Sequence, residues 1–390
     1  MVQTRALGLL SFLFFAFGFI TCLNDLLVPH LKNSFELDFT RSILVQFCFF
    51  MAYFVISPPA GKIVEKLGYK KGVTTGLVIM AVGCGLFGPA ALWHSFPLFL
   101  TALFILAGGI ALLQVAANPY IARLGNPATA SRRLTLVQAF NSLGTAIAPW
   151  LGALLIFRAG FSGAESVVAP YLGLAGLLLL LALLVQLTTL PEIIEEDSGE
   201  AVKGKLKDYP HLILGILGIF FYVGSEVAIG SFLVSLMGLA EMGSMDEVTA
   251  AKYVSIYWTG AMVGRFAGSA YMQKFGPART LLLHALAAVA MIVASLVLSG
   301  FAALSCLLFV GYCNSIMFPT IFTQALEGVG SYTKKGSSLL CMAIVGGALV
   351  PLVQAQIADS SMGLRASYIV PLVGYVYIAF FALTRTRSSR

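Results

Sequence analysis

An aspartate inside an apolar stretch is the first residue of this chain whose position suggests chemistry. Asp25 lies in Leu7–Leu31, a run with no other carboxylate and no lysine or arginine. The run is long enough to cross the roughly 30 Å hydrocarbon core of a bilayer as a helix, where an aspartate costs about 2.5–3.5 kcal/mol. A carboxylate kept there usually faces a cavity and handles protons, ions or polar substrates. We interpret Asp25 as a cation-coupling residue; the alternative is an acid near a helix end that reaches water.

The residues around Asp25 support the first interpretation. Pro29 has no N–H and cannot donate to the carbonyl of Asp25, so we expect a kinked helix with a free acceptor beside the carboxylate. Thr21, Asn24 and Asp25 share one helix face. Asn24 therefore joins the candidate ligand contacts.

A second carboxylate, Glu226, also lies deep in an apolar stretch. Tyr222 precedes it by four residues, which places both side chains on one helix face. Glu226 can carry a cation or accept hydrogen bonds from a ligand, so it is a candidate for both roles. The alternative is a hydrogen-bonded structural acid.

Amide side chains recur at helical spacing. Gln114 and Asn118 are four residues apart, and Gln138 and Asn141 are three apart. Amides both donate and accept, which suits a ligand rich in hydroxyl groups, although amides also hold helices together. The candidate ligand contacts are Asn24, Gln46, Gln114, Asn118, Gln138, Asn141, Tyr222, Glu226, Tyr257, Trp258, Asn314 and Gln354.

The composition places these residues in a membrane. Of the 390 residues, 59% are hydrophobic and 11% charged, and the mean hydropathy is +0.92, whereas soluble domains carry about a quarter charged residues. The net charge of +7 does not indicate nucleic-acid binding, because the basic residues lie between apolar stretches. The six cysteines lie inside such stretches and form no CxxC pair, so we interpret them as small apolar fillers. We expect no metal site and no cofactor.

Twelve apolar stretches along the chain are long enough to span a bilayer. They cover residues 6–31, 42–61, 72–93, 97–122, 134–157 and 169–190, then 210–237, 249–273, 278–299, 301–326, 337–358 and 366–384. The polar segment between the two sets carries both charge signs, which is typical of a solvated linker. We predict an all-α membrane protein with six-helix bundles in 1–190 and 210–390 and a cytoplasmic linker in 191–209.

The distribution of basic residues predicts the orientation. With the N-terminus in the cytoplasm, 19 of the 24 lysines and arginines fall in cytoplasmic loops, termini or adjacent helix ends. The exceptions are Lys32, Arg41, Arg158, Lys252 and Arg365. The positive-inside rule then places both termini in the cytoplasm.

The two halves repeat their landmarks in the same order. Asn118-Pro119-Tyr120-Ile121 precedes the basic pair Arg132-Arg133, then Gly144 and Pro149. Phe318-Pro319-Thr320-Ile321 precedes Lys334-Lys335, then Gly346 and Pro351. A parallel repeat of two bundles is expected to bind its ligand between them near the middle of the membrane.

The loop between the second and third stretches reads GKIVEKLGYKK from Gly61 to Lys71. It resembles the G-x-x-x-D-R-x-G-R-K loop of the major facilitator superfamily, with Glu65 in place of the aspartate and Lys66 in place of the arginine. The resemblance implies a conformational latch formed by Gly61, Glu65, Lys66, Gly68 and Lys70. The alternative is a basic loop that only sets the topology.

A narrower resemblance covers nearly the whole chain. The segments are GFITCLNDLLVPHLK (18–32), QVAANPYIARLG (114–125), QAFNSLGT (138–145), NSIMFPTIFTQAL (314–326) and KGSSLLCMAIVGGALVP (335–351). They are similar to the fucose–galactose–glucose:proton symporters, with Asp25, Asn118 and Asn141 at matching positions. The fucose branch has a glutamate where this chain has Gln114, which favours the glucose/galactose branch.

The resemblance implies a secondary active transporter, not an enzyme. It would be a monomer in the cell (inner or plasma) membrane that imports a hexose by alternating access, coupled to H⁺ or alternatively to Na⁺. An uncoupled facilitator, an L-fucose transporter and a membrane sugar sensor that does not transport are the other hypotheses. No P-loop or HExxH motif is present in the sequence, so neither ATP-driven transport nor this type of zinc peptidase is supported.

Overall fold

The computed structural model describes residues 2–34, 39–156, 168–191, 193 and 205–388. Side chains are described throughout these ranges except at 2, 4, 23–34, 39–44, 149–156, 247, 248, 251 and 388. The described elements are all helices, as expected for apolar segments that must satisfy every backbone polar group within the membrane. The chain forms two compact units.

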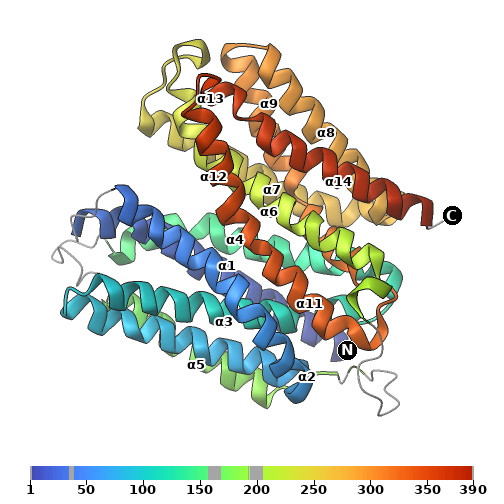
Figure 1. Ribbon diagram of the computed structural model, residues 1–390. Helices are drawn as coiled ribbons and strands as arrows, with labels where there is room; N and C mark the ends of the chain where they lie inside the picture. Colours follow the sequence, from blue (N-terminus) through green and yellow to red (C-terminus); the bar gives the residue numbers. More distant parts are fainter. Residues whose placement is uncertain (1, 35–38, 157–167, 192, 194–204, 389–390) are drawn as a thin grey trace. The chain divides into compact units, whose positions relative to one another are not determined.

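The first unit comprises Met1–Gly125, Phe140–Lys203 and Gly330–Met342. Its helices are α1 (Val2–Ser34), α2 (Phe39–Leu92), α3 (Phe96–Arg123), most of α4 (Ala130–Ile156), α5 (Val168–Leu187) and α11 (Thr333–Met342). α2, α3 and α5 run side by side (Figure 1). α2 contains two of the predicted spans, separated by a kink at Gly68, whose φ of 79° favours glycine.

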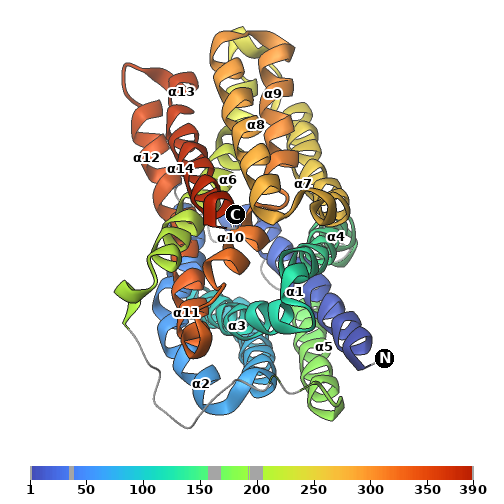
Figure 2. The same cartoon turned by 90° about the vertical axis from the view of Figure 1, so that its right-hand side faces the viewer.

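The second unit comprises Asn126–Ala139, Gly204–Val329 and Ala343–Arg390. Its long helices are α6 (Pro210–Met237), α7 (Glu247–Phe275), α8 (Pro277–Val297), α9 (Gly300–Asn314) and α14 (Ile369–Ser388). The shorter ones are α10 (Met317–Ala325), α12 (Gly346–Ala358) and α13 (Gly363–Ala366). α8 packs against α9 on one side and against α14 on the other (Figure 2).

Two of the predicted spans are interrupted. The span predicted at 301–326 forms α9 and α10, with a break at Ser315 and Ile316; Pro319 cannot donate to the carbonyl of Ser315, which weakens the helix at this point. The span predicted at 337–358 forms α11 and α12, separated by a short 3₁₀ turn at Ala343–Val345. Two glycines follow that turn, and glycine is a poor helix former.

Within the described residues, nine helical stretches are long and apolar enough to cross a membrane, and one of them, Val45–Leu92, contains two predicted spans. α7, which corresponds to the predicted span 249–273, is long enough but more polar. α4 corresponds to the predicted span 134–157, and its apolar end lies outside the residues whose side chains are described. A more polar helix in a membrane protein is stable when protein or a cavity covers its polar face.

Each compact unit includes one short segment from the half of the chain that otherwise forms the other unit. Residues 330–342 pack in the first unit, where Ser337 donates to the Val115 carbonyl (2.9 Å) and Ser338 fits against Gly61. Residues 126–139 pack in the second unit, where the hydroxyls of Ser131 and Thr323 are 2.6 Å apart. The bundle boundaries predicted at 190 and 210 follow chain order and stay a prediction.

A close helix crossing occurs in both units. Gly144 of α4 lies against the Phe15 carbonyl of α1, and Gly346 of α12 lies against the Phe220 carbonyl of α6. At each position a Cβ atom would clash with the facing backbone, so only glycine permits the approach. Because Gly144 and Gly346 are landmarks of the predicted repeat, the crossing supports it.

Candidate functional site

A hydrogen-bonded polar cluster occupies the interior of the second unit. It begins on α6, where the Tyr222 hydroxyl donates to Oε1 of Glu226 at 2.8 Å. Tyr222 is buried and Glu226 is partly buried. The helical spacing that predicts a shared face for these two residues thus corresponds to a direct hydrogen bond.

Three fully buried side chains from other helices extend this cluster. Asn314, at the end of α9, donates through Nδ2 to the Tyr257 hydroxyl of α7 at 2.7 Å. The Tyr375 hydroxyl of α14 donates to Asn314 Oδ1 at 2.6 Å. Tyr257 donates in turn to the backbone carbonyl of Glu226 at 3.3 Å. Tyr257 and Asn314 are predicted contacts that the structure brings together with Glu226, whereas Tyr375 is an addition.

A basic residue also acts on the carboxylate of this cluster. Arg265 of α7 is within electrostatic reach of Glu226, and its Nε donates to the Ser315 carbonyl at 3.2 Å. Ten residues separate Arg265 from the end of α7 at Phe275, which is about 15 Å along a helix. Arg265 is one of the 19 basic residues that the sequence assigns to cytoplasmic loops, termini or adjacent helix ends. That assignment is wrong for Arg265, because its charge lies inside the span. Charges at that depth usually have partners and functional roles.

The first unit contains a related tyrosine–amide pair. Gln114 of α3 donates through Nε2 to the Tyr53 hydroxyl of α2 at 2.9 Å, and both side chains are buried. One helical turn further along α3, Asn118 is fully buried with neither amide atom hydrogen-bonded to a described group. A buried amide without partners is costly, so Asn118 is a strong candidate for a ligand or conformational role.

Two amides on α4 differ in their surroundings. Asn141 donates to the Phe14 carbonyl of α1 at 3.1 Å, next to the crossing at Gly144. Gln138 is buried and lies in the segment that packs in the second unit. The structure therefore ties Asn141 to the helix that carries Asp25. Asn24 and Asp25 lie in α1, but their side chains are outside the described part of the structure.

The remaining predicted contacts lie outside the cluster around Glu226. Gln46 is exposed on α2. Gln354 of α12 is fully buried and donates to the Ser367 hydroxyl at 3.3 Å. Trp258 is 39% exposed and stacks edge-on against Tyr257, with ring centroids 5.2 Å apart. Of these, only Trp258 contacts the cluster.

The predicted latch residues have diverse environments. Glu65 and Lys66 are exposed, and Lys70 donates to the Gln186 carbonyl at the end of α5 at 2.8 Å. Gly61 contacts Ser338, and Gly68 forms the kink in α2. Around the same loop, Lys334 lies 5.5 Å from the centroid of the Tyr69 ring. The latch stays a prediction.

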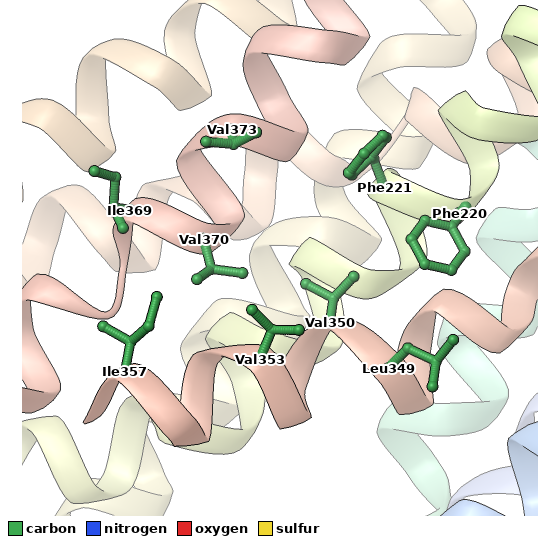
Figure 3. A pocket seen from close by; sticks show the side chains of 9 residues that line it. All are labelled: Phe220, Phe221, Leu349, Val350, Val353, Ile357, Ile369, Val370 and Val373. Carbon is green, nitrogen blue, oxygen red and sulfur yellow. The ribbon is translucent and has the colours of Figure 1, made fainter. Parts of the chain in front are cut away.

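A cavity of about 410 Å³ lies between α6, α12 and α14 (Figure 3). Its lining consists of the side chains of Phe220, Phe221, Leu349, Val350, Val353, Ile357, Ile369, Val370 and Val373. A hydroxylated ligand needs a few placed polar groups, and these side chains supply none. The cavity is therefore no candidate for the site that the amides and carboxylates indicate.

The sequence does not identify three of the functional candidates, which are Tyr53, Arg265 and Tyr375. Tyr53 and Tyr257 are separated by 204 residues, close to the spacing of the other repeat landmarks. That offset is the signal that could have identified Tyr53 from its partner. Tyr375 carries no comparable signal, because an aromatic residue in a span usually only packs.

Comparisons with known proteins agree with this picture. Residues 9–351 match the protein family described as Major Facilitator Superfamily. The chain is 48% identical over 390 residues to the glucose/galactose transporter of Brucella abortus biovar 1, covering 98% of this chain and 94% of that protein. It is 33% identical over 409 residues to the L-fucose-proton symporter of Escherichia coli, covering 98% and 93%. The crystal structure of the transporter FucP in the outward conformation matches with a TM-score of 0.90 and 32% identity, covering 99% of both chains.

Proposed function

The chain belongs to the major facilitator superfamily, and we propose that it imports glucose or galactose by cation-coupled symport, with H⁺ as the favoured cation. The observation that carries the proposal is the 48% identity to a glucose/galactose transporter over 98% of the chain. The predicted fold class, a multi-span helical protein of this superfamily, is confirmed. The resemblance to the fucose–galactose–glucose symporters is also confirmed. The chain is a transporter rather than an enzyme.

The two units supply different ligand groups. In the first unit, the buried amides Gln114 and Asn118 and the partly buried Asn141 provide donors and acceptors for sugar hydroxyls. In the second unit, Glu226 provides a carboxylate acceptor held by Tyr222, with Trp258 as a surface for the apolar face of the ring. The hydrogen-bonding chemistry and the burial of these side chains support the assignments. The fucose branch has a glutamate at the position of Gln114, so this residue favours glucose or galactose over L-fucose.

Asp25 is our candidate for the coupling carboxylate. It lies within a long apolar helix, where a carboxylate is costly and usually has a functional role. The support for H⁺ is the relatedness to a protein described as an L-fucose-proton symporter. Glu226 is the rival, because it is also a carboxylate within a span.

The proposed setting is a monomer in the inner or plasma membrane with both termini in the cytoplasm. The support is the excess of lysine and arginine in the loops on that side. Alternating access by the two halves then moves the sugar from one side to the other.

Counterflow and active uptake in proteoliposomes test the proposal. A panel of glucose, galactose and L-fucose is assayed at several pH values, with and without a sodium gradient. Accumulation of glucose or galactose driven by an inward proton gradient is the expected result. Accumulation driven only by sodium would replace H⁺ as the coupling cation. Equilibration without accumulation would indicate an uncoupled facilitator, and a preference for L-fucose would replace glucose or galactose as the substrate. Sugar binding without any flux would indicate a sensor.

A further inference from the structure

A relay of hydrogen bonds leads from α14 to the backbone at Glu226. Tyr375 donates to Asn314 Oδ1 at 2.6 Å, Asn314 Nδ2 donates to Tyr257 at 2.7 Å, and Tyr257 donates to the Glu226 carbonyl at 3.3 Å. Tyr375, Asn314 and Tyr257 are each 0% exposed. The relay therefore joins four helices, α14, α9, α7 and α6, through side chains that do not reach water.

The direction of the relay is set at its last step. A carbonyl oxygen can only accept, so the single proton of the Tyr257 hydroxyl is directed to Glu226. Tyr257 must then accept from the Asn314 amide, which turns Nδ2 toward Tyr257 and leaves Oδ1 for Tyr375. A flipped amide would direct Oδ1 at Tyr257 and would compete with Glu226 for the same proton.

We propose that Tyr375 is a positioning residue for sugar binding, which acts on Glu226 through Asn314 and Tyr257. Tyr375 supplies the donor that fixes the orientation of the Asn314 amide. That orientation keeps the Tyr257 hydroxyl against the turn of α6 that carries Glu226, and Tyr222 holds the carboxylate from the same helix. The inference rests on the proposed function, because it takes the Glu226 carboxylate to accept hydrogen bonds from sugar hydroxyls.

Removing one hydroxyl tests this role. In Tyr375→Phe, Asn314 Oδ1 loses its donor, the amide can flip, and the Tyr257 proton can turn from Glu226 to Asn314. We expect the KM for glucose or galactose to rise about three- to tenfold, the change that one misplaced hydrogen bond produces, with the maximal rate largely retained. The KM is measured by initial-rate uptake into proteoliposomes that contain equal amounts of purified protein.

The matched control is Tyr377→Phe on the same helix. The Tyr377 hydroxyl also donates a hydrogen bond, but its acceptor is the Leu214 carbonyl near the start of α6, at 3.0 Å. This bond lies outside the relay, so the KM of the control is expected to stay within about twofold of the parent value. An equal rise in both variants would show a general packing effect and overturn the inference.

A double variant distinguishes action through the relay from an independent effect. Tyr257→Phe cuts the relay next to Glu226, so adding Tyr375→Phe to it is expected to leave the KM unchanged. Multiplication of the two single effects would overturn the inference. If Tyr375→Phe does not accumulate in the membrane, Tyr257→Phe alone must raise the KM about three- to tenfold. A normal KM in that variant would equally overturn the inference.

Glu226→Gln separates failure of the inference from failure of the proposed function. A raised KM in Glu226→Gln together with a normal KM in Tyr375→Phe would remove Tyr375 and leave Glu226 as a sugar contact. A normal KM in Glu226→Gln would instead remove the sugar role of Glu226, and the inference with it. Absence of hexose uptake by the parent protein would overturn the proposed function itself.

Discussion

Tyr53 and Tyr257 are 204 residues apart in the chain, and each hydroxyl accepts a hydrogen bond from an amide within its own unit. The donor is Gln114 of α3 in the first unit and Asn314 of α9 in the second. Around these related pairs the two units differ. In the second unit the amide is also held by Tyr375, and the relay ends at the turn that carries a carboxylate. The repeat therefore preserves a tyrosine–amide pair while its surroundings have diverged.

The identity of residue 114 is predicted to control which sugar is preferred. Gln114→Glu introduces the residue type of the fucose branch at a buried position bonded to Tyr53. We expect the ratio of L-fucose to glucose uptake to rise, because a carboxylate accepts hydrogen bonds but, when ionised, cannot donate them. Competition of each sugar against labelled glucose measures the ratio. Gln273→Glu, at an exposed glutamine near the end of α7, is the control, and equal shifts in both variants would refute the assignment.

Asn141→Ala is predicted to weaken sugar binding by roughly two- to tenfold, the effect of losing one hydrogen bond of about 0.5–1.5 kcal/mol. The substitution also removes the bond to the Phe14 carbonyl, so stability must be measured alongside affinity. Thr145→Val serves as the control, because Thr145 bonds the Gly18 carbonyl (3.3 Å) across the same helix pair. A comparable loss of affinity in the control would show that Asn141 only joins helices.

The sequence predicts the helices well because apolar length and composition determine which segments enter a membrane. It also predicts that Tyr222 and Glu226 share a face, since their spacing alone places them there, and the structure joins them directly. Which faces meet is a different question. The bond between Asn314 and Tyr375 spans 61 residues, and helical periodicity does not say which helices become neighbours.

Hydropathy also does not reveal local helix breaks or the depth of a buried charge. The interruption at Ser315 and Ile316 lies within an apolar run, where hydropathy gives no signal, although Pro319 offers one. The sequence places Arg265 with the cations at helix ends, because it lies eight positions before the end of the predicted span 249–273. The extent of α7 to Phe275 places Arg265 deeper in the span, within electrostatic reach of Glu226.

Arg365, one of the five basic residues outside the predicted cytoplasmic set, is expected to stabilise the second unit. It pairs with Glu241 at 3.0 Å and donates to the carbonyls of Ser295 and Leu296 near the end of α8 at 3.2 and 3.1 Å. A cation at a helix C-terminus satisfies carbonyls that have no partner within the helix. We predict that Arg365→Ala lowers the free energy of unfolding by about 1.5–3 kcal/mol.

Thermal unfolding of the detergent-solubilised protein measures this effect as a fall in Tm. Arg387→Ala is the matched control, because Arg387 is exposed near the end of α14. An unchanged Tm for Arg365→Ala, or an equal fall for both variants, would contradict a role for Arg365 at the end of α8.

Asp25 is predicted to couple cation movement to sugar movement. A side chain that cannot titrate cannot load a proton on one side and release it on the other, so Asp25→Asn should lose gradient-driven accumulation. Sugar exchange should persist, because the amides and Glu226 still provide hydrogen bonds to the sugar. The measurements are accumulation under an imposed proton gradient and counterflow without one, in the same proteoliposomes.

Glu226→Gln provides the comparison, since Glu226 is a carboxylate on α6 whose Oε1 accepts from Tyr222. If Asp25 couples and Glu226 binds sugar, Glu226→Gln should raise the KM in both assays and still accumulate sugar at saturating concentration. The reverse pattern would assign coupling to Glu226: accumulation retained in Asp25→Asn and lost in Glu226→Gln, with counterflow intact in both. Loss of counterflow in Asp25→Asn would place Asp25 in the sugar site as well, because exchange needs no net proton movement.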